Sequence, residues 1–421
     1  MNAPKGLTSK ILIGMGAGVV LGIILNLLGA GRAEGAMGLL IDTFDVGGQI
    51  FVKGLKLLVV PLVFVSLVCG TAALDDIKKL GRVGGTTVLL YLGTTAVAIS
   101  LALLFAIVIQ PGAGFDLDSQ TAATFSAKDA PPLKETFLAI FPTNPVNALA
   151  EGNMLQIIVF SILFGLAMTM AGESGKRVSE VFNHLNEVMM RLVMILMWLA
   201  PAGVFCLVTK VFAQQGFDAI APLAKYFFVV LAVLLVQALV VYPSILALLS
   251  RLNPKIFLSK MKEVWAFAFS TSSSNATIPI TLETAENKLG VKNSIASFTV
   301  PLGATINMDG TAIMQGVATG FIAQAYGIDI GLQGYLMVIL TATLASIGTA
   351  GVPGVGLITL AMVLNQVGLP VEGIALIIGV DRLLDMVRTA VNVTGDSTVT
   401  CIVAKREKQL DPEIFNDRSR T

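Results

Sequence analysis

The sequence predicts an all-α membrane protein with eight membrane-spanning helices and two re-entrant helical hairpins. Three observations support this fold class. Hydrophobic residues make up 55% of the 421 residues and charged residues only 13%, whereas a soluble domain carries roughly 25% charged residues. The apolar residues gather into runs about 20 residues long, enough to cross a bilayer core. Two further apolar segments are interrupted by small and polar residues.

The apolar runs lack the period-2 alternation of barrel strands, so helices are the remaining structure that satisfies the backbone inside lipid. We expect spans near residues 8–30, 44–75, 83–110, 153–172, 176–212, 219–250, 295–325 and 371–404. The first run is too long for the apolar core of a signal peptide, and no small-residue cleavage site follows it clearly. It is therefore interpreted as the first membrane helix, with the N-terminus inside.

The two interrupted segments, 256–290 and 331–368, are interpreted as re-entrant hairpins. Thr271–Pro279 breaks the first and Ser346–Gly354 breaks the second. Each break contains a proline, which disrupts the helical hydrogen-bond ladder. Exposed backbone at membrane depth is tolerated only where it is buried in protein or lines a cavity. Each segment therefore reads as two half-helices that meet at a tip.

Basic residues cluster after the second, fourth, sixth and last spans, which makes that side cytoplasmic. They are Lys78, Lys79, Arg82, Lys176, Arg177, Arg251, Lys255, Lys260, Lys262, Lys405, Arg406 and Lys408. The opposite loop 111–152 carries acidic residues. Lys53 and Lys56 do not fit, because we expect them near the outer start of the second span. Either their long stems reach outward, or they lie at an interface between moving parts.

Each hairpin is followed by a helix rich in polar residues, and the predicted topology brings the hairpins in from opposite sides. That is an inverted repeat, which in secondary transporters places the substrate near the membrane midplane between the tips. The alternative is that both breaks are ordinary Gly/Pro loops.

The last span carries the most unusual group of residues, because a charge at the bilayer centre costs at least about 2.5–3.5 kcal/mol. Along it stand Asp381, Arg382, Asp385, Arg388, Asn392 and Asp396. Four of these polar residues are separated by three, four and four positions and share one helical face. A buried ion-pair network that only holds helices together could be replaced by apolar packing. A polar pathway for solute and ions explains the charges better.

The preceding span contains the sequence Asn307-Met-Asp309-Gly310-Thr311, which we interpret as a cation site. Glycine weakens the helix and can leave carbonyl oxygens unpaired beside the carboxylates. Hard oxygen ligands without thiolate or imidazole suit a small cation rather than a transition metal. Tyr91, Thr94 and Thr95 add hydroxyls on one face of the third span, although alone they would be ordinary interhelical hydrogen-bonding groups.

Several other functions are disfavoured. The net charge of +1 and the lack of a basic stripe argue against a nucleic-acid partner. The three cysteines are scattered and indicate neither disulfides nor a metal cluster. The carboxylates of the last span have no nucleophile, metal triad or phosphate loop beside them, which argues against an enzyme.

Four motifs in order, SSSNATIP, NMDGT, SIGTAGVPG and DRLLDMVRTAVNVTGD, resemble those of the dicarboxylate/amino acid:cation symporter family, the glutamate transporter family. The resemblance runs from the second span to Asp396. It implies a homotrimer in the lipid of a bacterial or archaeal plasma membrane. Each protomer would move its cargo by an elevator mechanism, with the second hairpin as the gate.

The same resemblance implies a division of the chain into a fixed scaffold and a moving transport domain. The scaffold would comprise helices 1 and 2 in residues 1–82 and helices 4 and 5 in 153–212. The transport domain would comprise helix 3 in 83–110 and residues 213–404. An extracellular loop, 111–152, and a solvated cytoplasmic tail, 405–421, complete the chain.

Carried over residue by residue, the family pattern implies roles in binding an amino acid. Arg388 would hold the side-chain carboxylate of the substrate together with Thr311, and a planar guanidinium suits that contact. Asp385 would take the α-ammonium group. The remaining contacts would come from Ser273, Ser274, Gly351, Val352, Thr389 and Asn392.

The family pattern also implies three sites for co-transported Na⁺. The first would use Asp396 with carbonyls of Gly303, Asn307 and Asn392. The second would use carbonyls of Thr305, Ser346, Ile347 and Thr349. The third would use Tyr91, Thr94, Thr95, Asn307 and Asp309.

Having both Arg388 and Asp385 points to L-aspartate or L-glutamate, because family members for neutral amino acids lack the arginine and those for C4-dicarboxylates lack the aspartate. Ser272 stands where some prokaryotic relatives carry an arginine, and Arg382 is a candidate electrostatic replacement for it. Gln315 stands where animal glutamate transporters have a proton-carrying glutamate. The alternatives are a proton-coupled carrier of glutamate or C4-dicarboxylates and, in another class, an anion channel.

Overall fold

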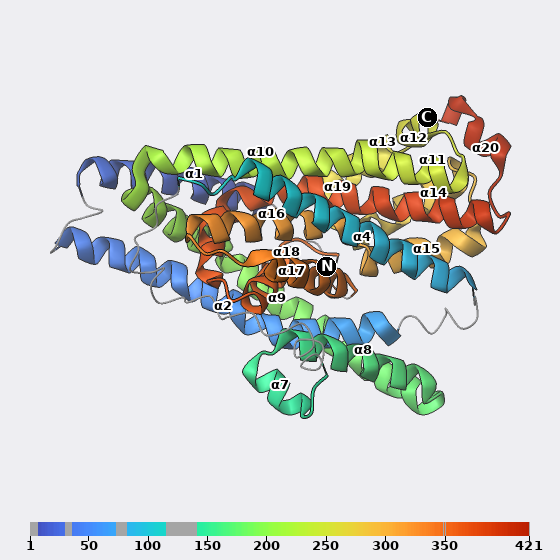
Figure 1. The fold of residues 1–421 in the computed structure, drawn as a ribbon, viewed down its shortest axis with the longest axis horizontal. Helices are drawn as coiled ribbons and strands as arrows, with labels where there is room; N and C mark the ends of the chain where they lie inside the picture. The colour runs from blue at the N-terminus through green and yellow to red at the C-terminus, as the bar shows by residue number, and fades with distance from the viewer. Residues whose placement is uncertain are drawn as a thin grey trace.

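The computed structural model describes residues 7–29, 36–72, 82–114, 141–347, 349 and 351–420. Within these ranges the chain is helical throughout, and its only β-type pairing is an isolated bridge between Val291 and Leu410. The helices run roughly along one long axis (Figure 1). Most of the predicted loop 111–152, and two positions of the second hairpin tip, lie outside the described residues.

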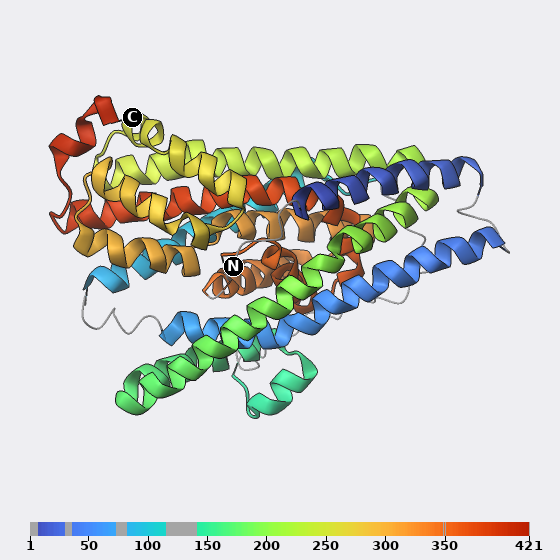
Figure 2. The same cartoon turned by 180° about the vertical axis from the view of Figure 1, so that it is seen from behind.

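One group of helices packs around the 43-residue α9. It consists of α1 (Leu7–Leu27), α2 (Ala36–Ala72), α7 (Pro145–Glu151), α8 (Met154–Met170) and α9 (Glu173–Gln215). The most extensive contacts join α9 to α1 and to α2, and α2 also packs on α8. In Figure 2, α1 and α2 lie on opposite sides of α9 at one end of the molecule.

A second group packs around α19 (Ile374–Arg406). Its members are α4 (Arg82–Ile109), α10 (Ile220–Val236), η3 (Gln237–Val241), α11 (Tyr242–Ser250), α12 (Pro254–Lys260), α13 (Lys262–Thr271), α14 (Ser274–Asn287), α15 (Asn293–Ile306), α16 (Asp309–Ala325), α17 (Gly331–Ser346) and α18 (Val355–Gln366). Helix α19 contacts α4, α10, α11 and α13 to α16. It is therefore the central helix of this group.

The two groups meet mainly through α18 and α19, which pack on α2 and α9. The first group corresponds to the expected scaffold, and the second contains the helices expected in the transport domain. Both expected hairpins are present: α13 and α14 form the first, and α17 and α18 form the second. At the first tip, Ser273 caps α14 by accepting a hydrogen bond from the amide of Ala276.

Five helices are long and apolar enough to cross a membrane by length and composition, among the residues described. They are Ser9–Leu27, Gly38–Cys69, Val83–Ile109, Glu173–Gln215 and Ile220–Ser250. Helix α19 has 33 residues and is long enough, but its charged residues make it too polar for that criterion. The expected span 295–325 is divided at Asn307 and Met308 into α15 and α16.

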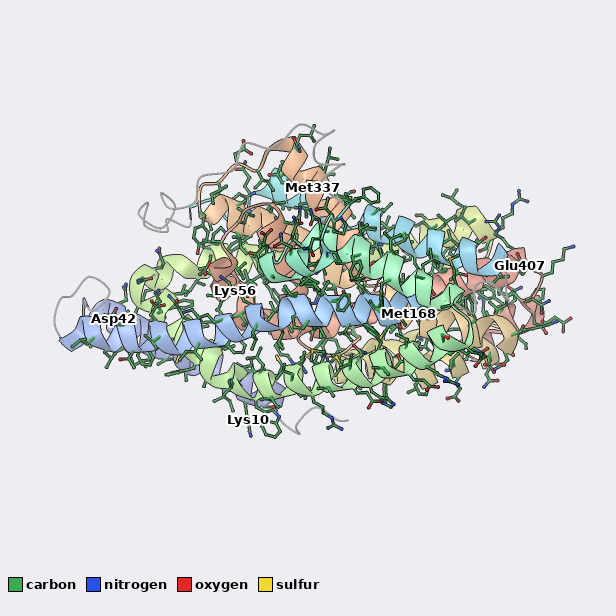
Figure 3. The ribbon with its side chains drawn as sticks, turned by 90° about the horizontal axis from the view of Figure 1, so that it is seen from below. Lys10, Asp42, Lys56, Met168, Met337 and Glu407 are labelled. Carbon is green, nitrogen blue, oxygen red and sulfur yellow. The ribbon has the colours of Figure 1, made fainter. Side chains whose placement is uncertain are left out.

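Two expectations about the chain are wrong. Helix α2 begins at Ala36 rather than near residue 44, so Lys53 and Lys56 lie toward its middle and not at its outer start (Figure 3). The C-terminal tail is docked rather than solvated. The amide of Lys292 donates to the carbonyl of Gln409 over 2.9 Å, and the side chain of Phe415 is 1% exposed.

Candidate functional site

The charged residues of α19 pair with one another. Arg388 is 1% exposed, and its Nη1 lies 2.9 Å from Asp381 Oδ1 while its Nη2 lies 2.7 Å from Asp385 Oδ1. Arg382 Nη1 lies 3.2 Å from Asp385 Oδ2. Two cations and two anions thus balance within three helical turns. Such a balance is needed because an unpaired ion buried in protein costs several kcal/mol.

Pairing leaves the guanidinium of Arg388 with spare hydrogen-bonding capacity. A guanidinium has five N–H donors, and the Nε of Arg388 has no partner among the described residues. A substrate carboxylate can therefore bind here and share the cation with Asp381. Asp385, released from Arg388, can then accept from an ammonium group. The geometry thus supports the two opposite charges expected in a bound amino acid.

Thr311, Gly310 and Gly356 surround Arg388. An added Cβ at Gly356 would lie 3.3 Å from both Arg388 Nη1 and Thr311 Cγ2. An added Cβ at Gly310 would lie 2.5 Å from the carbonyl oxygen of Arg388. These glycines let α16 and the second hairpin reach the arginine closely. Asn392 holds α16 in place, because its Oδ1 accepts from the amide of Gly310 over 2.7 Å.

The two hairpin tips touch beside this cluster. Ser273 Oγ donates to the carbonyl of Gly351 over 2.6 Å, and the amide of Asn275 donates to the same carbonyl over 3.2 Å. An added Cβ at Gly351 would lie 3.0 Å from Ser274 Cβ. Three of the expected substrate-contacting residues therefore contact one another in a closed arrangement.

The positions of the remaining residues expected to bind substrate do not indicate what they contact in a substrate. Thr389 is buried, and its hydroxyl donates to the carbonyl of Asp385 over 2.8 Å, one turn earlier in the same helix. Val352 is half-buried at the second tip. Neither placement by itself defines a role in substrate binding.

Asp396 is the centre of the first expected cation site. Its Oδ1 accepts from Asn307 Nδ2 over 2.9 Å, and Asn307 Nδ2 also lies 3.3 Å from the carbonyl oxygen of Asn392. An added Cβ at Gly303 would lie 2.5 Å from Asp396 Oδ1 and 2.7 Å from the hydroxyl of Tyr91. All four expected ligand residues are thus brought together, with Tyr91 at their edge.

Asp309 forms a second buried cluster, and here the structure adds residues that the sequence analysis missed. Thr95 Oγ1 donates to Asp309 Oδ1 over 2.6 Å, while Tyr242 donates to Oδ2 over 2.8 Å and Gln237 Nε2 lies 3.3 Å from Oδ2. Thr94 Oγ1 lies 3.3 Å from Asn307 Oδ1. Of the residues expected in the third cation site, Thr95 contacts Asp309 and Thr94 contacts Asn307, whereas the hydroxyl of Tyr91 donates to the carbonyl of Thr299 over 2.9 Å.

Gln237 is the first residue of η3, a π-helical turn within a long apolar helix, and Tyr242 follows its last residue. Such turns are rare in proteins overall, and those that occur are often at functional sites. The available sequence signal was two polar side chains in an otherwise apolar span. Their partner, Asp309, is 67 and 72 residues away, so the contact was not evident from spacing.

The expected second cation site is the least defined. The hydroxyls of Thr305, Ser346 and Thr349 donate to carbonyls one turn earlier in their own segments. Ser346, Ile347 and Thr349 are buried at the second tip. The described hydrogen bonds do not by themselves bring these residues to one point.

The structure also places the positions that depart from the family pattern. Arg382 contacts Asp385 from within α19, and Ser272 at the first tip is 2% exposed, its hydroxyl having no hydrogen-bond partner among the residues that the structure describes. Gln315 Nε2 donates to Thr359 Oγ1 of the second hairpin over 2.8 Å. Gln315 is thus engaged as a neutral hydrogen-bonding group between α16 and α18.

Comparison with known proteins gives consistent matches over nearly the whole chain. Residues 7–406 match the sodium:dicarboxylate symporter family. A proton/glutamate-aspartate symporter of Escherichia coli is 38% identical, covering 97% of this chain and 95% of the relative. A proton/sodium-glutamate symport protein of Geobacillus stearothermophilus is 37% identical, covering 97% and 96%. A C4-dicarboxylate transport protein of Rhodospirillum rubrum is 36% identical, covering 96% and 88%.

Proposed function

Because this chain belongs to the sodium:dicarboxylate symporter family, we propose that it couples the entry of Na⁺ to the uptake of L-aspartate or L-glutamate. The family and these relatives are membrane transporters, so the chain is a cation-coupled membrane transporter rather than an enzyme. The choice of substrate and of Na⁺ rests on the geometry of the buried charges.

The observation that carries the substrate assignment is the contact between Arg388 and Asp385 in the interior, with a distance of 2.7 Å. A solute with an ammonium group and a distal carboxylate can separate the pair and satisfy both members. A neutral amino acid would leave the arginine without its second anion, and a simple dicarboxylate would leave Asp385 with Arg382 as its one remaining cation. Incomplete compensation of a buried charge disfavours both, which makes the site selective.

The choice of Na⁺ is supported by the two oxygen-rich clusters around Asp309 and Asp396. Both carboxylates are buried, with exposed fractions of 0% and 1%. Hydroxyl, amide and carbonyl oxygens surround them, and such hard ligands suit an alkali cation. The Escherichia coli relative carries a name that specifies protons, so proton coupling is the competing outcome of the test below.

The elevator mechanism is supported by the packing of the helices into two groups. In this proposal α4 and the helices from α10 to α19 move together against α1, α2, α8 and α9. Cations and substrate together allow the second hairpin to close as a gate, and only the closed group moves. The contact between Ser273 and Gly351 supports the idea that the two tips can close on each other. We further propose, from the family resemblance, that three copies assemble in the lipid bilayer.

Uptake into liposomes tests the proposal directly. Purified protein is reconstituted, and entry of labelled L-aspartate is measured with a Na⁺ gradient alone and then with a proton gradient alone. We expect uptake only with Na⁺, and competition by L-glutamate and D-aspartate but not by succinate or serine. Uptake driven by protons alone would overturn the Na⁺ assignment. Stronger competition by succinate than by unlabelled L-aspartate would overturn the substrate assignment.

Two substitutions assign the charges. Asp385→Asn removes the partner of the ammonium group, and Arg388→Cys removes the partner of the distal carboxylate. Each is expected to weaken binding of L-aspartate by about 30-fold or more, since breaking a buried charge pair costs about 2–5 kcal/mol. Arg388→Cys should retain or gain binding of serine. Equal loss of all substrates in both variants would indicate misfolding instead of loss of recognition, and size-exclusion chromatography separates the two cases.

A further inference from the structure

One ion pair joins the two groups of helices directly. Lys56 Nζ of α2 lies 2.7 Å from Glu372 Oε1 of η4 (Val371–Gly373), the turn that precedes α19. The two residues are 316 positions apart in the chain. Their side chains are 38% and 47% exposed. The pair therefore lies at the rim of the contact between the groups and not in its core.

The position of this pair is unexpected from the predicted topology. Glu372 precedes the last span and belongs to its outer end, because the basic residues that follow this span mark the cytoplasmic side. Lys56 follows Ala36, the outer start of α2, by 20 residues, which corresponds to roughly 30 Å along the helix. Figure 3 places Lys56 well inside the length of α2. The outer end of α19 thus lies beside the middle of α2.

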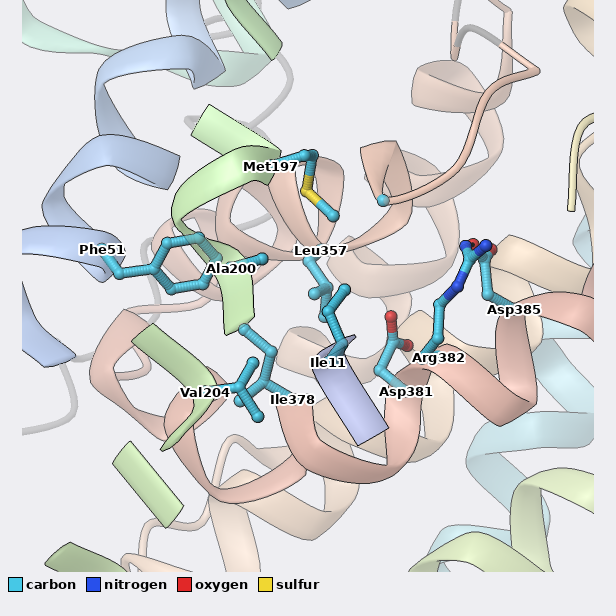
Figure 4. A pocket seen from close by; sticks show the side chains of 11 residues that line it. Ile11, Phe51, Met197, Ala200, Val204, Leu357, Ile378, Asp381, Arg382 and Asp385 are labelled. Atoms are coloured by element: carbon cyan, nitrogen blue, oxygen red, sulfur yellow. Dashed lines mark hydrogen bonds and ion pairs between the residues drawn. The ribbon is translucent and has the colours of Figure 1, made fainter. Parts of the chain in front are cut away.

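A second contact indicates the same displacement independently. Helix α1 runs outward from Leu7, so Ile11 and Met15 belong to its cytoplasmic half. An added Cβ at Gly379, near the outer end of α19, would lie 3.2 Å from Met15 Sδ. Ile11 also lines one pocket together with Asp381 of α19 (Figure 4). Both α1 and α2 therefore meet the substrate-carrying group in a position shifted toward the cytoplasm.

We propose that the ion pair between Lys56 and Glu372 is a latch that stabilises this cytoplasm-shifted position and must open in every transport cycle. The proposal rests on the moving group of the proposed function. A partly exposed lysine at this depth is stabilised by an anionic partner, and Glu372 supplies one only in the cytoplasm-shifted position. Outward movement carries Glu372 away along the axis. An interaction present in one position alone shifts the equilibrium toward that position.

The latch is tested by measuring the position of the moving group in the full-length protein. Cys69, Cys206 and Cys401 are replaced by serine, and spin labels are attached through Asp42→Cys on α2 and Asp329→Cys after α16. Both positions are exposed and lie at the outer ends of their groups. Labelled chains are diluted with unlabelled chains, so that each assembly contains one labelled copy. The distance distribution is recorded in lipid without Na⁺ or substrate.

In the protein without latch substitutions, we expect the longer distance between the two spin labels, which corresponds to the cytoplasm-shifted position, to predominate. Lys56→Gln and Glu372→Gln should each lower the ratio of long to short distances by about 1.5-fold to 5-fold, the range for partly exposed ion pairs. The double variant should show no further decrease, and the exchanged pair Lys56→Glu with Glu372→Lys should restore the ratio. Restoration by exchange distinguishes a charge interaction from general loss of packing.

Lys53→Gln is the matched control, because Lys53 is an exposed lysine one turn earlier on the same helix. It should leave the distribution unchanged. A distribution that is identical in the control and in both latch variants would overturn the proposal, as would an exchanged pair that behaves like the single variants. The measurement needs no transported solute. If the protein failed to take up acidic amino acids, that result would overturn the proposed function. The distance measurement would still test the latch.

Discussion

At the candidate site, the absence of a side chain at a glycine matters as much as the charged and polar side chains. Gly303 is the clearest case, because the carboxylate of Asp396 and the hydroxyl of Tyr91 both occupy the space where a side chain would begin. The backbone can then approach the carboxylate closely enough for a carbonyl oxygen and the carboxylate to share one small cation. A single methyl group at this position tests whether that close approach matters.

Gly303→Ala is expected to weaken Na⁺ binding strongly. Its Cβ would lie 2.5 Å from Asp396 Oδ1, so the carboxylate must move, and overpacking of this kind costs about 1–3 kcal/mol. That range corresponds to a roughly 5-fold to 150-fold increase in the Na⁺ concentration for half-maximal uptake. Gly93→Ala on α4 is the control, because an added Cβ there meets no atom within 4 Å. An unchanged Na⁺ dependence in Gly303→Ala would remove Asp396 and Gly303 from the cation site.

The charged residues of α19 were predictable from the sequence, whereas several of their neighbours were not. A charge within an apolar run is expensive, so Arg388 and Asp385 were conspicuous without any knowledge of the fold. Tyr242 and Gln237 were not, because hydroxyl and amide groups are common in membrane helices and are usually satisfied locally. Their role depends on Asp309, which only the packing of α10 and α11 against α16 and α19 brings near.

At the scale of helices, hydropathy predicted the type and order of the elements well and their boundaries less well. The start of α2 was predicted too late because Asp42 interrupts the apolar pattern ahead of residue 44. In the structure the helix runs through Asp42 and Asp45, and Asp45 Oδ1 lies 2.7 Å from Lys210 Nζ of α9. The break between α15 and α16 was missed because Met308 and its neighbours read as helix when the contacts of Asn307 are unknown.

Helix α1 is fastened to α9 mainly by close apolar packing, with one polar contact near its end, where Asn26 Nδ2 donates to the carbonyl of Ala213 over 2.9 Å. Gly14, Gly18 and Gly22 stand four residues apart and face α9. Added Cβ atoms at these positions would lie 2.6, 2.9 and 2.6 Å from atoms of α9. Small residues spaced four apart let membrane helices approach closely and gain dispersion contacts. This glycine stripe explains why the pairing of α1 with α9 is among the most extensive in the molecule.

Gly18→Val is expected to separate α1 from α9. The added side chain would begin 2.9 Å from the carbonyl oxygen of Phe205, and the helices must part or the chain must distort, at a cost of about 1–3 kcal/mol. The thermal unfolding midpoint of the detergent-solubilised protein should fall. Gly16→Val provides the comparison within the same helix, since an added Cβ at Gly16 meets no atom within 4 Å. Equal midpoints for the two variants would contradict the packing described.

The end of the whole molecule that we expect to be cytoplasmic is closed by a contact that composition did not predict. The tail was expected to be solvated because residues 405–421 are rich in charge, yet Phe415 and Leu410 are buried there. Lys260, itself 1% exposed, donates to the carbonyls of Lys288, Ile414 and Phe415 over 2.7, 2.8 and 2.8 Å. One ammonium group thereby joins the start of the first hairpin, its end, and the C-terminal segment. The high proportion of charged residues in the tail did not indicate that one lysine would bind backbone carbonyl groups.

Lys260→Met should loosen this end of the group of helices around α19 while leaving the aliphatic packing of the side chain largely intact. Without the ammonium group, three carbonyl oxygens lose their donor, and the expected destabilisation is roughly 3 kcal/mol. Hydrogen exchange monitored by mass spectrometry should show faster exchange at residues 409–416, where the amide of Asp411 donates to the carbonyl of Gly290 over 2.8 Å. Lys262→Met, at an exposed lysine two positions away, should leave these rates unchanged. Because the same carbonyls hold the end of the first hairpin, residues 286–292 should exchange faster together with the tail. Faster hydrogen exchange in the tail alone would mean that Lys260 stabilises the C-terminal segment but not the first hairpin.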